Sequence, residues 1–171
     1  MNHYDWPLKL RVLYDKSLDY SGRGGREAES FLTSEERSEL GAIGIAPIHL
    51  FDFADDFLKY GDPQWETFLL VASARRDYFL YELGGKPAAS QLREEDLPPK
   101  KEALEGYVWL PRIVRKAQSF LEGTLPTEIM YGCGGDRNFL REHDLHMGEF
   151  LRMVWASHGN ASKLLRFLKK P

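Results

Sequence analysis

The stretch Met147-Gly-Glu-Phe-Leu-Arg-Met-Val-Trp155 gives the clearest indication of the fold. Its apolar side chains recur every three or four residues, at Met147, Phe150, Leu151, Val154 and Trp155. This period is typical of an α-helix that buries one face against the rest of the protein. The stretch therefore predicts an amphipathic helix in which Trp155 is mostly buried.

The same helical period extends over most of the chain. It predicts further helices over residues 6–20, 47–58, 65–83, 110–120 and 161–168. Thr33 and Glu36 form a capping-box pattern before a short helix, Pro47 suits a first helical turn, and Asn160 is a good N-cap. Strand-like alternation is scarce, and the best candidate is the short segment Thr127–Tyr131. We therefore predict an all-α fold with few or no strands.

A connection without helical period separates two helical regions. It begins at Gly84 and contains three prolines, at positions 87, 98 and 99. The length of 171 residues suits one ordinary domain. We expect residues 1–171 to form a single compact domain, with internal units 1–84 and 101–171 joined by the Pro-rich connection 85–100.

A shift of 100 residues aligns the two units without gaps. It pairs Leu10 with Leu110, Lys16 with Lys116, Tyr20 with Phe120, Phe31 with Tyr131, Glu36 with Asp136, Arg37 with Arg137 and Leu40 with Leu140. Few of these pairs are identical, so the argument depends on apolar positions that recur in order. Two interpretations stay open: two related helical units packed together, or two unrelated helical stretches with the same period.

Composition and charge exclude several classes of protein. The chain is 43% hydrophobic and 29% charged, which excludes a disordered tail, and no apolar run is long enough to span a membrane. The net charge is −3, so nucleic acid is not an expected partner, although residues 86–171 carry 14 Lys and Arg against 11 Asp and Glu. The single cysteine, Cys133, and the absence of a signal-peptide pattern lead us to expect a cytoplasmic location.

The segment Tyr131-Gly-Cys-Gly-Gly-Asp-Arg137 is the most informative turn. Its glycines surround Cys133, and a helix is expected to start near Asp136. The favoured interpretation is a tight turn capped by Asp136, with Cys133 in a small apolar gap. Two alternatives stay open: an anion site formed by backbone N–H groups and Arg137, and a reactive thiolate at Cys133.

Two clusters of polar residues receive simpler interpretations. His146 and Glu149 lie one helical turn apart, but two ligands do not make a metal site, so no metal is predicted. Asp52, Asp55 and Asp56 lie on the polar side of a predicted helix. We expect them to form a surface ion network with Arg75, Arg76 or Lys16.

Residues 104–168 resemble a known bacterial family. The features that carry the resemblance are Leu110-Pro111-Arg112, Lys116, the Tyr131–Arg137 turn, Phe139-Leu140 and Phe150-Leu151. In order and spacing they are similar to the domain of unknown function family 5069. The resemblance implies a small, mainly helical module, and it implies no activity, substrate or cofactor.

The leading functional prediction is a non-catalytic binding or protein-interaction module that uses an apolar groove between the two units. No signature of a hydrolase elbow, zinc protease, phosphate loop or dinucleotide site occurs in the sequence. The alternative is an enzyme that binds a small molecule or anion at the Gly-rich turn, with Cys133 as a catalytic candidate. Its candidate ligand-binding residues are Arg112, Lys116, Tyr131, Cys133, Gly134, Gly135, Asp136 and Arg137. No cofactor is predicted, and the partner is expected to be a protein or a small anionic ligand.

Overall fold

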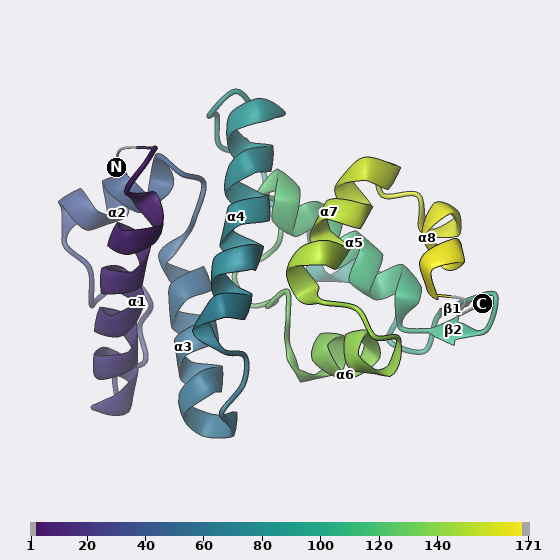
Figure 1. Ribbon diagram of the computed structural model, residues 1–171, viewed down its shortest axis with the longest axis horizontal. Coiled ribbons are helices and arrows are strands. Elements are labelled where there is room, and N and C mark those ends of the chain that lie inside the picture. Colours follow the sequence, from purple (N-terminus) through teal and green to yellow (C-terminus); the bar gives the residue numbers. More distant parts are fainter. Residues whose placement is uncertain (1–2, 169–171) are drawn as a thin grey trace.

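The computed structural model describes residues 3–168, and these residues form eight α-helices. In chain order the helices are α1 (Trp6–Gly22), α2 (Ser34–Gly41), α3 (Pro47–Tyr60), α4 (Trp65–Tyr81), α5 (Leu110–Glu122), α6 (Gly134–Glu142), α7 (Met147–Ser157) and α8 (Ala161–Leu168). Between α4 and α5 lie one 3₁₀ turn, η1 (Glu94–Asp96), and an antiparallel pair of two-residue strands, β1 (Ala103–Leu104) and β2 (Tyr107–Val108). The predicted all-α class is confirmed (Figure 1).

Several helix starts follow from their local sequence. The Thr33 hydroxyl accepts the Glu36 N–H at 3.2 Å while the Glu36 carboxylate accepts the Thr33 N–H at 2.8 Å, so the predicted capping box is confirmed. Pro47 is the first residue of α3, and Asn160 Oδ1 accepts the Lys163 N–H at 3.3 Å at the start of α8. These contacts satisfy N–H groups that a helix start leaves without an internal partner.

The segment Thr127–Tyr131, the best strand candidate in the sequence, is a loop. Within it the Ile129 N–H donates to the Pro126 carbonyl at 3.0 Å and closes a turn. The Tyr131 hydroxyl donates to the Met147 carbonyl at 2.9 Å, so the segment is held by α7.

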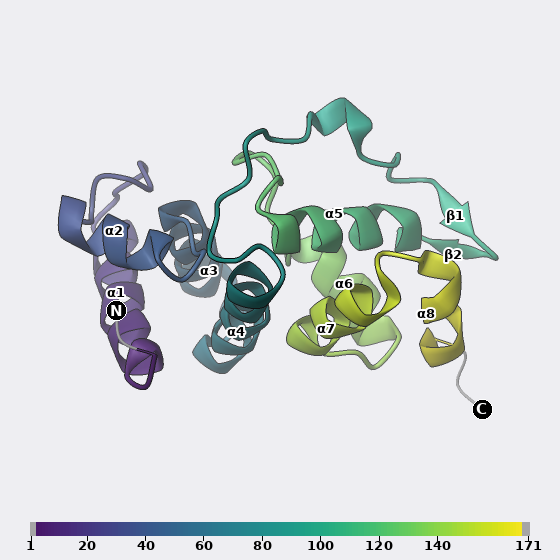
Figure 2. The ribbon, with the colours of Figure 1, turned by 90° about the horizontal axis from the view of Figure 1, so that it is seen from above.

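Helix α4 joins the two halves of the molecule. Figure 1 shows α1 to α3 on one side of it and α5 to α8 on the other, and Figure 2 shows the same order from above. Helix α1 packs against α3, whereas α4 packs against α7 and α5. Residues on several faces of α4 are buried: Phe68, Val71, Ala72, Ala74, Arg75, Arg76 and Phe79. A helix buried on opposite sides is expected when it lies between two layers.

Four contacts in the first half recur 100 residues later. The ion pair Lys16–Glu36 matches Lys116–Asp136, and the stacked rings Tyr20–Phe31 match Phe120–Tyr131. Arg37 Nη1 donates to the Leu32 carbonyl, as Arg137 Nη1 donates to the Gly132 carbonyl. The Ile45 N–H donates to the Leu40 carbonyl, as the Leu145 N–H donates to the Leu140 carbonyl. The two ring pairs have nearly the same geometry, with centroids 5.5 and 5.4 Å apart and planes inclined by 30°. These matched contacts favour the interpretation of two related units, which stays a prediction.

Trp155 is mostly but not fully buried, in line with the expectation. Its ring packs edge-on against Tyr78 of α4, with centroids 5.4 Å apart. The indole N–H donates to Glu82 Oε1 at 2.9 Å. The position lies at the edge of the contact between α4 and α7, because the helical period identifies the packed face but not its width. Met147, Phe150, Leu151 and Val154 are buried as predicted.

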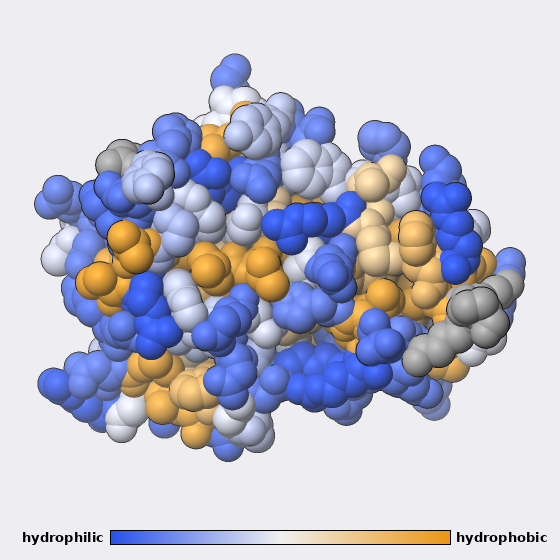
Figure 3. Space-filling model, in the orientation of Figure 1, coloured by the Kyte–Doolittle hydropathy of each residue, from blue (hydrophilic) through white to orange (hydrophobic). Residues whose placement is uncertain are grey.

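The surface shows no continuous apolar face in the orientation of Figure 3. Apolar patches lie over both halves of this face and are separated by hydrophilic side chains. The exposed apolar residues include Leu8 and Val12 of α1 and Leu70 of α4. None of the described helices combines the length and the apolar composition that crossing a bilayer requires.

The two matched ion pairs allow a controlled stability experiment. Lys116 and Asp136 have side chains only 3% and 0% exposed, whereas Lys16 and Glu36 are 40% and 23% exposed. Lys116→Met leaves a buried carboxylate without its cation and should reduce the free energy of unfolding by about 3–5 kcal/mol. Lys16→Met at the matching position should cost less than about 1 kcal/mol. Urea unfolding of both variants measures the difference, and equal small losses would show that burial does not strengthen the second pair.

Candidate functional site

The Gly-rich turn adopts the special backbone geometry that its glycines predict. Gly132 has φ 91°, in the left-handed region that favours glycine, and α6 begins at Gly134 with Cys133 as its N-cap residue. A Cβ on Gly132 would lie 2.7 Å from Met147 Sδ, and one on Gly135 would lie 2.6 Å from the Trp109 ring. Close packing within the fold therefore accounts for both of these glycines.

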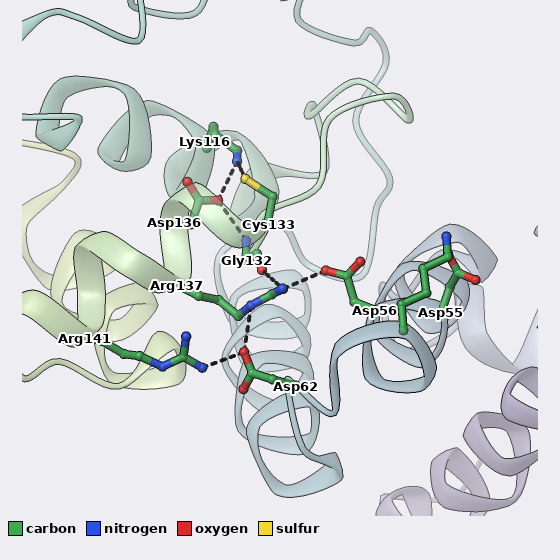
Figure 4. Close-up of polar contacts among 10 residues, drawn as sticks. Asp55, Asp56, Asp62, Lys116, Gly132, Cys133, Asp136, Arg137 and Arg141 are labelled. Carbon is green, nitrogen blue, oxygen red and sulfur yellow. Dashed lines mark hydrogen bonds and ion pairs between the residues drawn. The ribbon is translucent and has the colours of Figure 1, made fainter.

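The Asp136 carboxylate is the centre of this turn (Figure 4). It is fully buried and pairs with the Lys116 ammonium group. It also accepts the Gly132 N–H at 2.9 Å and the Trp109 indole N–H at 2.9 Å. The predicted role of Asp136 as the cap of α6 is wrong in detail, because the N–H group that it accepts precedes the helix. In the described part of the chain no side chain caps the first turn of α6.

Arg137 links α6 to the first half of the chain. Its guanidinium group donates to the Gly132 carbonyl at 2.7 Å, and it forms ion pairs with Asp56 at 2.7 Å and Asp62 at 2.8 Å. Arg141 reaches the same Asp62 at 2.5 Å. Figure 4 shows these contacts bridging the two halves. The Arg137 donors are therefore used within the fold.

The remaining candidates from the sequence are placed as follows. Arg112 is buried and donates to the Pro98 carbonyl at 2.8 Å, which holds the connection onto α5.

Tyr131 is buried. Its burial, and to a smaller extent the negative charge of Asp136, raises the pKa of its hydroxyl well above the ordinary value. Cys133 is half-buried, with Sγ 3.3 Å from Lys116 Nζ, so the favoured prediction of a buried thiol is met only in part. Gly134 is exposed.

A separate cavity lies between the two halves, with a volume of about 310 Å³. Its walls come from the start of α3, the middle of α4, the connection near residues 87–91, the end of α5 and the loop before α6. Most of the wall is apolar and includes Ile45, Phe53, Phe79, Phe120, Leu125 and Met130. The Gly-rich turn contributes only Tyr131 to this cavity, and Cys133 is not among its lining residues.

Arg75 is the most unusual polar residue in this cavity. Its side chain is 4% exposed, and Nη1 donates to the Leu121 carbonyl at 2.9 Å. The guanidinium group lies over the Phe79 ring, 5.3 Å from its centroid. Within residues 3–168 no carboxylate forms an ion pair with Arg75, and its Nε is buried without a hydrogen-bond partner. Burial lowers the pKa of Arg75 to about 10, so the group remains cationic at neutral pH.

His49 lies in the same wall as a neutral ring. Its Nδ1 accepts the Ala46 N–H at 3.2 Å, which places the proton of the neutral ring on Nε2. The ring packs against Phe120 with centroids 4.7 Å apart. Burial, followed by the Arg75 charge, lowers the pKa of His49 to about 3. His49 therefore contributes an N–H donor and no charge at neutral pH.

Asp52 also lines the cavity, one helical turn after His49. Burial, followed by the charges of Asp56 and Asp55, raises its pKa to about 7. No hydrogen bond or ion pair joins its side chain to another residue in the described range 3–168. Asp52 therefore changes charge near neutral pH.

The predicted ion network of these aspartates has different partners. Asp55 pairs with Lys59 and accepts from the Ser21 hydroxyl at 2.7 Å, and Asp56 pairs with Arg137. The predicted partners Arg75, Arg76 and Lys16 are wrong. The reason is tertiary, since Arg75 is enclosed in the cavity, Arg76 pairs with Asp77 and Lys16 pairs with Glu36.

Comparisons with known protein families, with curated proteins and with solved structures returned no match. The resemblance of residues 104–168 to family 5069 stays a prediction. In residues 3–168, no group of three or more His, Cys, Asp or Glu side chains is placed to hold a metal ion. The functional argument therefore depends on the geometry of the cavity and of the turn.

Asp52→Asn should make the protein more stable at neutral and alkaline pH. The folded-state pKa of about 7 lies above the ordinary value of 3.8, so the folded protein binds this proton more tightly than the unfolded chain does. The stability that Asp52 contributes is present at low pH and is lost as the pH rises from 3.8 to about 7. The variant should gain about 1–2 kcal/mol at pH 8, less than the full shift implies because the side chain is only partly buried.

Urea unfolding of wild type and Asp52→Asn between pH 4 and pH 8 measures this gain. The gain should grow with pH up to about 7 and then become constant. A gain that is independent of pH would show that Asp52 is not the titrating group.

Proposed function

We propose that this protein is a non-catalytic binding module that holds a small molecule in the cavity between its two halves. The observation that carries the proposal is the cavity itself, which measures about 310 Å³ and has mostly apolar walls with a few polar side chains, among them Arg75, His49, Asp52 and Arg37. Its volume lies at the lower end of the range of about 300–1,000 Å³ that is typical of ligand sites. An apolar pocket with a few oriented polar groups is the usual composition of such a site.

The cavity favours a small molecule over a protein partner. On the face drawn in Figure 3 the apolar side chains form separate patches, so this face does not offer the continuous contact surface of a stable protein interface. The cavity walls combine residues from both halves and from the connection near residues 87–91. Binding there would be sensitive to any rearrangement of the connection.

The enzyme alternative has less support. Its supporting observation is the contact between Cys133 Sγ and the Lys116 ammonium group at 3.3 Å. Against it, Asp136 pairs with Lys116, and Arg137 is held by Gly132, Asp56 and Asp62. The two cations that were expected to attract an external anion, Lys116 and Arg137, are therefore already paired with carboxylates of the fold. Membership of family 5069 and a cytoplasmic location are further proposals that rest on the sequence alone.

A neutral fluorescent probe tests the proposed function. N-phenyl-1-naphthylamine should bind in the cavity with a Kd on the order of 10–100 µM and with increased emission, because apolar walls replace water around it. Gly41 lines the cavity and has open space where a Cβ would lie, so Gly41→Phe should weaken binding about tenfold. Fluorescence titration measures both.

Gly134→Phe is the matched control. Gly134 also has open space at its Cβ position, but it lies beside Cys133 and outside this cavity. This variant should bind the probe as wild type does. Loss of binding in Gly134→Phe with normal binding in Gly41→Phe would place the site at the Gly-rich turn and contradict the proposal.

A further inference from the structure

We propose that the ligand of the cavity is a small amphiphilic carboxylate whose charged group pairs with Arg75. This inference rests on the proposed function and names the chemical class of the ligand. It depends on the geometry of one buried guanidinium group and on the apolar space beside it.

The first step concerns the edge of the Arg75 guanidinium group that remains available. Nη1 is used by the Leu121 carbonyl at 2.9 Å. In the described part of the chain no hydrogen bond uses Nε or Nη2, and these two nitrogens present parallel N–H groups along one edge. A carboxylate can accept both of these N–H groups at once.

The second step concerns the space at this edge. Gly123 lines the cavity, and a Cβ on it would lie 2.6 Å from Arg75 Nη2. Gly123 also has φ 73°, which favours glycine. A side chain at this position would collide with Nη2, so glycine is what allows the guanidinium group to lie in the cavity wall.

The third step concerns charge. Other buried basic groups in the described chain meet carboxylates: Lys116 meets Asp136, Arg137 meets Asp56 and Arg76 meets Asp77. Arg112 has only a carbonyl partner, but it does not line the cavity. A buried cation without a counter-ion is costly, and an anionic ligand would remove much of that cost.

The other groups around the cavity are compatible with a carboxylate. His49 is neutral, lies close enough to Arg75 to respond to its charge, and carries a proton on Nε2 that can be donated. Arg37 of α2 is a second cation in the lining. Asp52 opposes an anion when it is ionised, but at pH 6 it is mostly protonated. The aromatic and aliphatic walls suit an acyl chain or a single aromatic ring.

The test compares hexanoate with hexanamide, which has the same chain and nearly the same shape but no charge. Isothermal titration calorimetry at pH 6 should show that wild type binds hexanoate at least about tenfold more tightly than hexanamide. Arg75→Met should abolish this preference and leave both compounds at the level of hexanamide. Arg76→Met is the matched control, since Arg76 is also buried but pairs with Asp77 and does not line the cavity. It should retain the preference.

The outcomes separate the inference from the proposed function. Equal binding of hexanoate and hexanamide by wild type would overturn the carboxylate inference and leave the binding module in place. Failure of both compounds and of the neutral probe would overturn the proposed function as well. Loss of the preference in Arg76→Met to the same extent as in Arg75→Met would also overturn the inference.

A measurement on wild type covers the case in which Arg75→Met does not fold. The ¹⁵N–¹H signal of Arg75 Nε, assigned with Arg75→Lys, should shift on addition of hexanoate and should not shift on addition of hexanamide, because only the carboxylate forms the charged pair. No shift at saturating hexanoate would contradict the pairing with Arg75.

Discussion

The second half of the molecule depends on the burial of one carboxylate, that of Asp136. A carboxylate that is fully enclosed must be matched by donors, and the fold supplies three, from Lys116, Gly132 and Trp109. These donors come from α5, from the Gly-rich turn and from the residue before α5, so satisfying one charge fixes the relative positions of three segments. The Gly-rich turn also holds the Tyr131 ring against the Phe120 ring, and both rings belong to the cavity wall. The Gly-rich segment therefore shapes the candidate site while contributing almost none of its polar groups.

The matching contact in the first half has a different physical character. Lys16 and Glu36 pair at the corresponding positions, but both side chains reach solvent. The difference follows from what covers each pair, because Trp109 donates to Asp136 and its ring lies over Gly135. One pattern of residues thus produces a surface ion pair in one half and a buried one in the other. Burial, and not residue identity, decides how much such a pair contributes to stability.

The sequence predicts the helices well and the cavity poorly. Helical period, the capping box at Thr33 and the proline at position 47 are local signals, and local signals are sufficient to place a helix. The cavity instead requires His49 and Asp52 of α3 to lie beside Arg75 of α4, with the connection folded back over them. No local pattern encodes that arrangement. One signal was available, since Arg75 lies in helical register with the apolar positions Phe68, Ala72 and Phe79, where a charge is out of place.

The position of Arg75 explains how this buried cation is tolerated although no carboxylate of the described chain pairs with it. Its Nη1 donates to the carbonyl of Leu121, in the last turn of α5, and such carbonyls have no partner within their own helix. The C-terminal end of a helix also carries partial negative charge, which favours a cation. The Phe79 ring offers its electron-rich face to the same guanidinium group. These contacts are weaker than a carboxylate pair, but they leave the edge of Nε and Nη2 without a partner. A carboxylate from the fold would stabilise Arg75 more strongly and would close that edge, so the partial compensation is what keeps a binding group available inside the cavity.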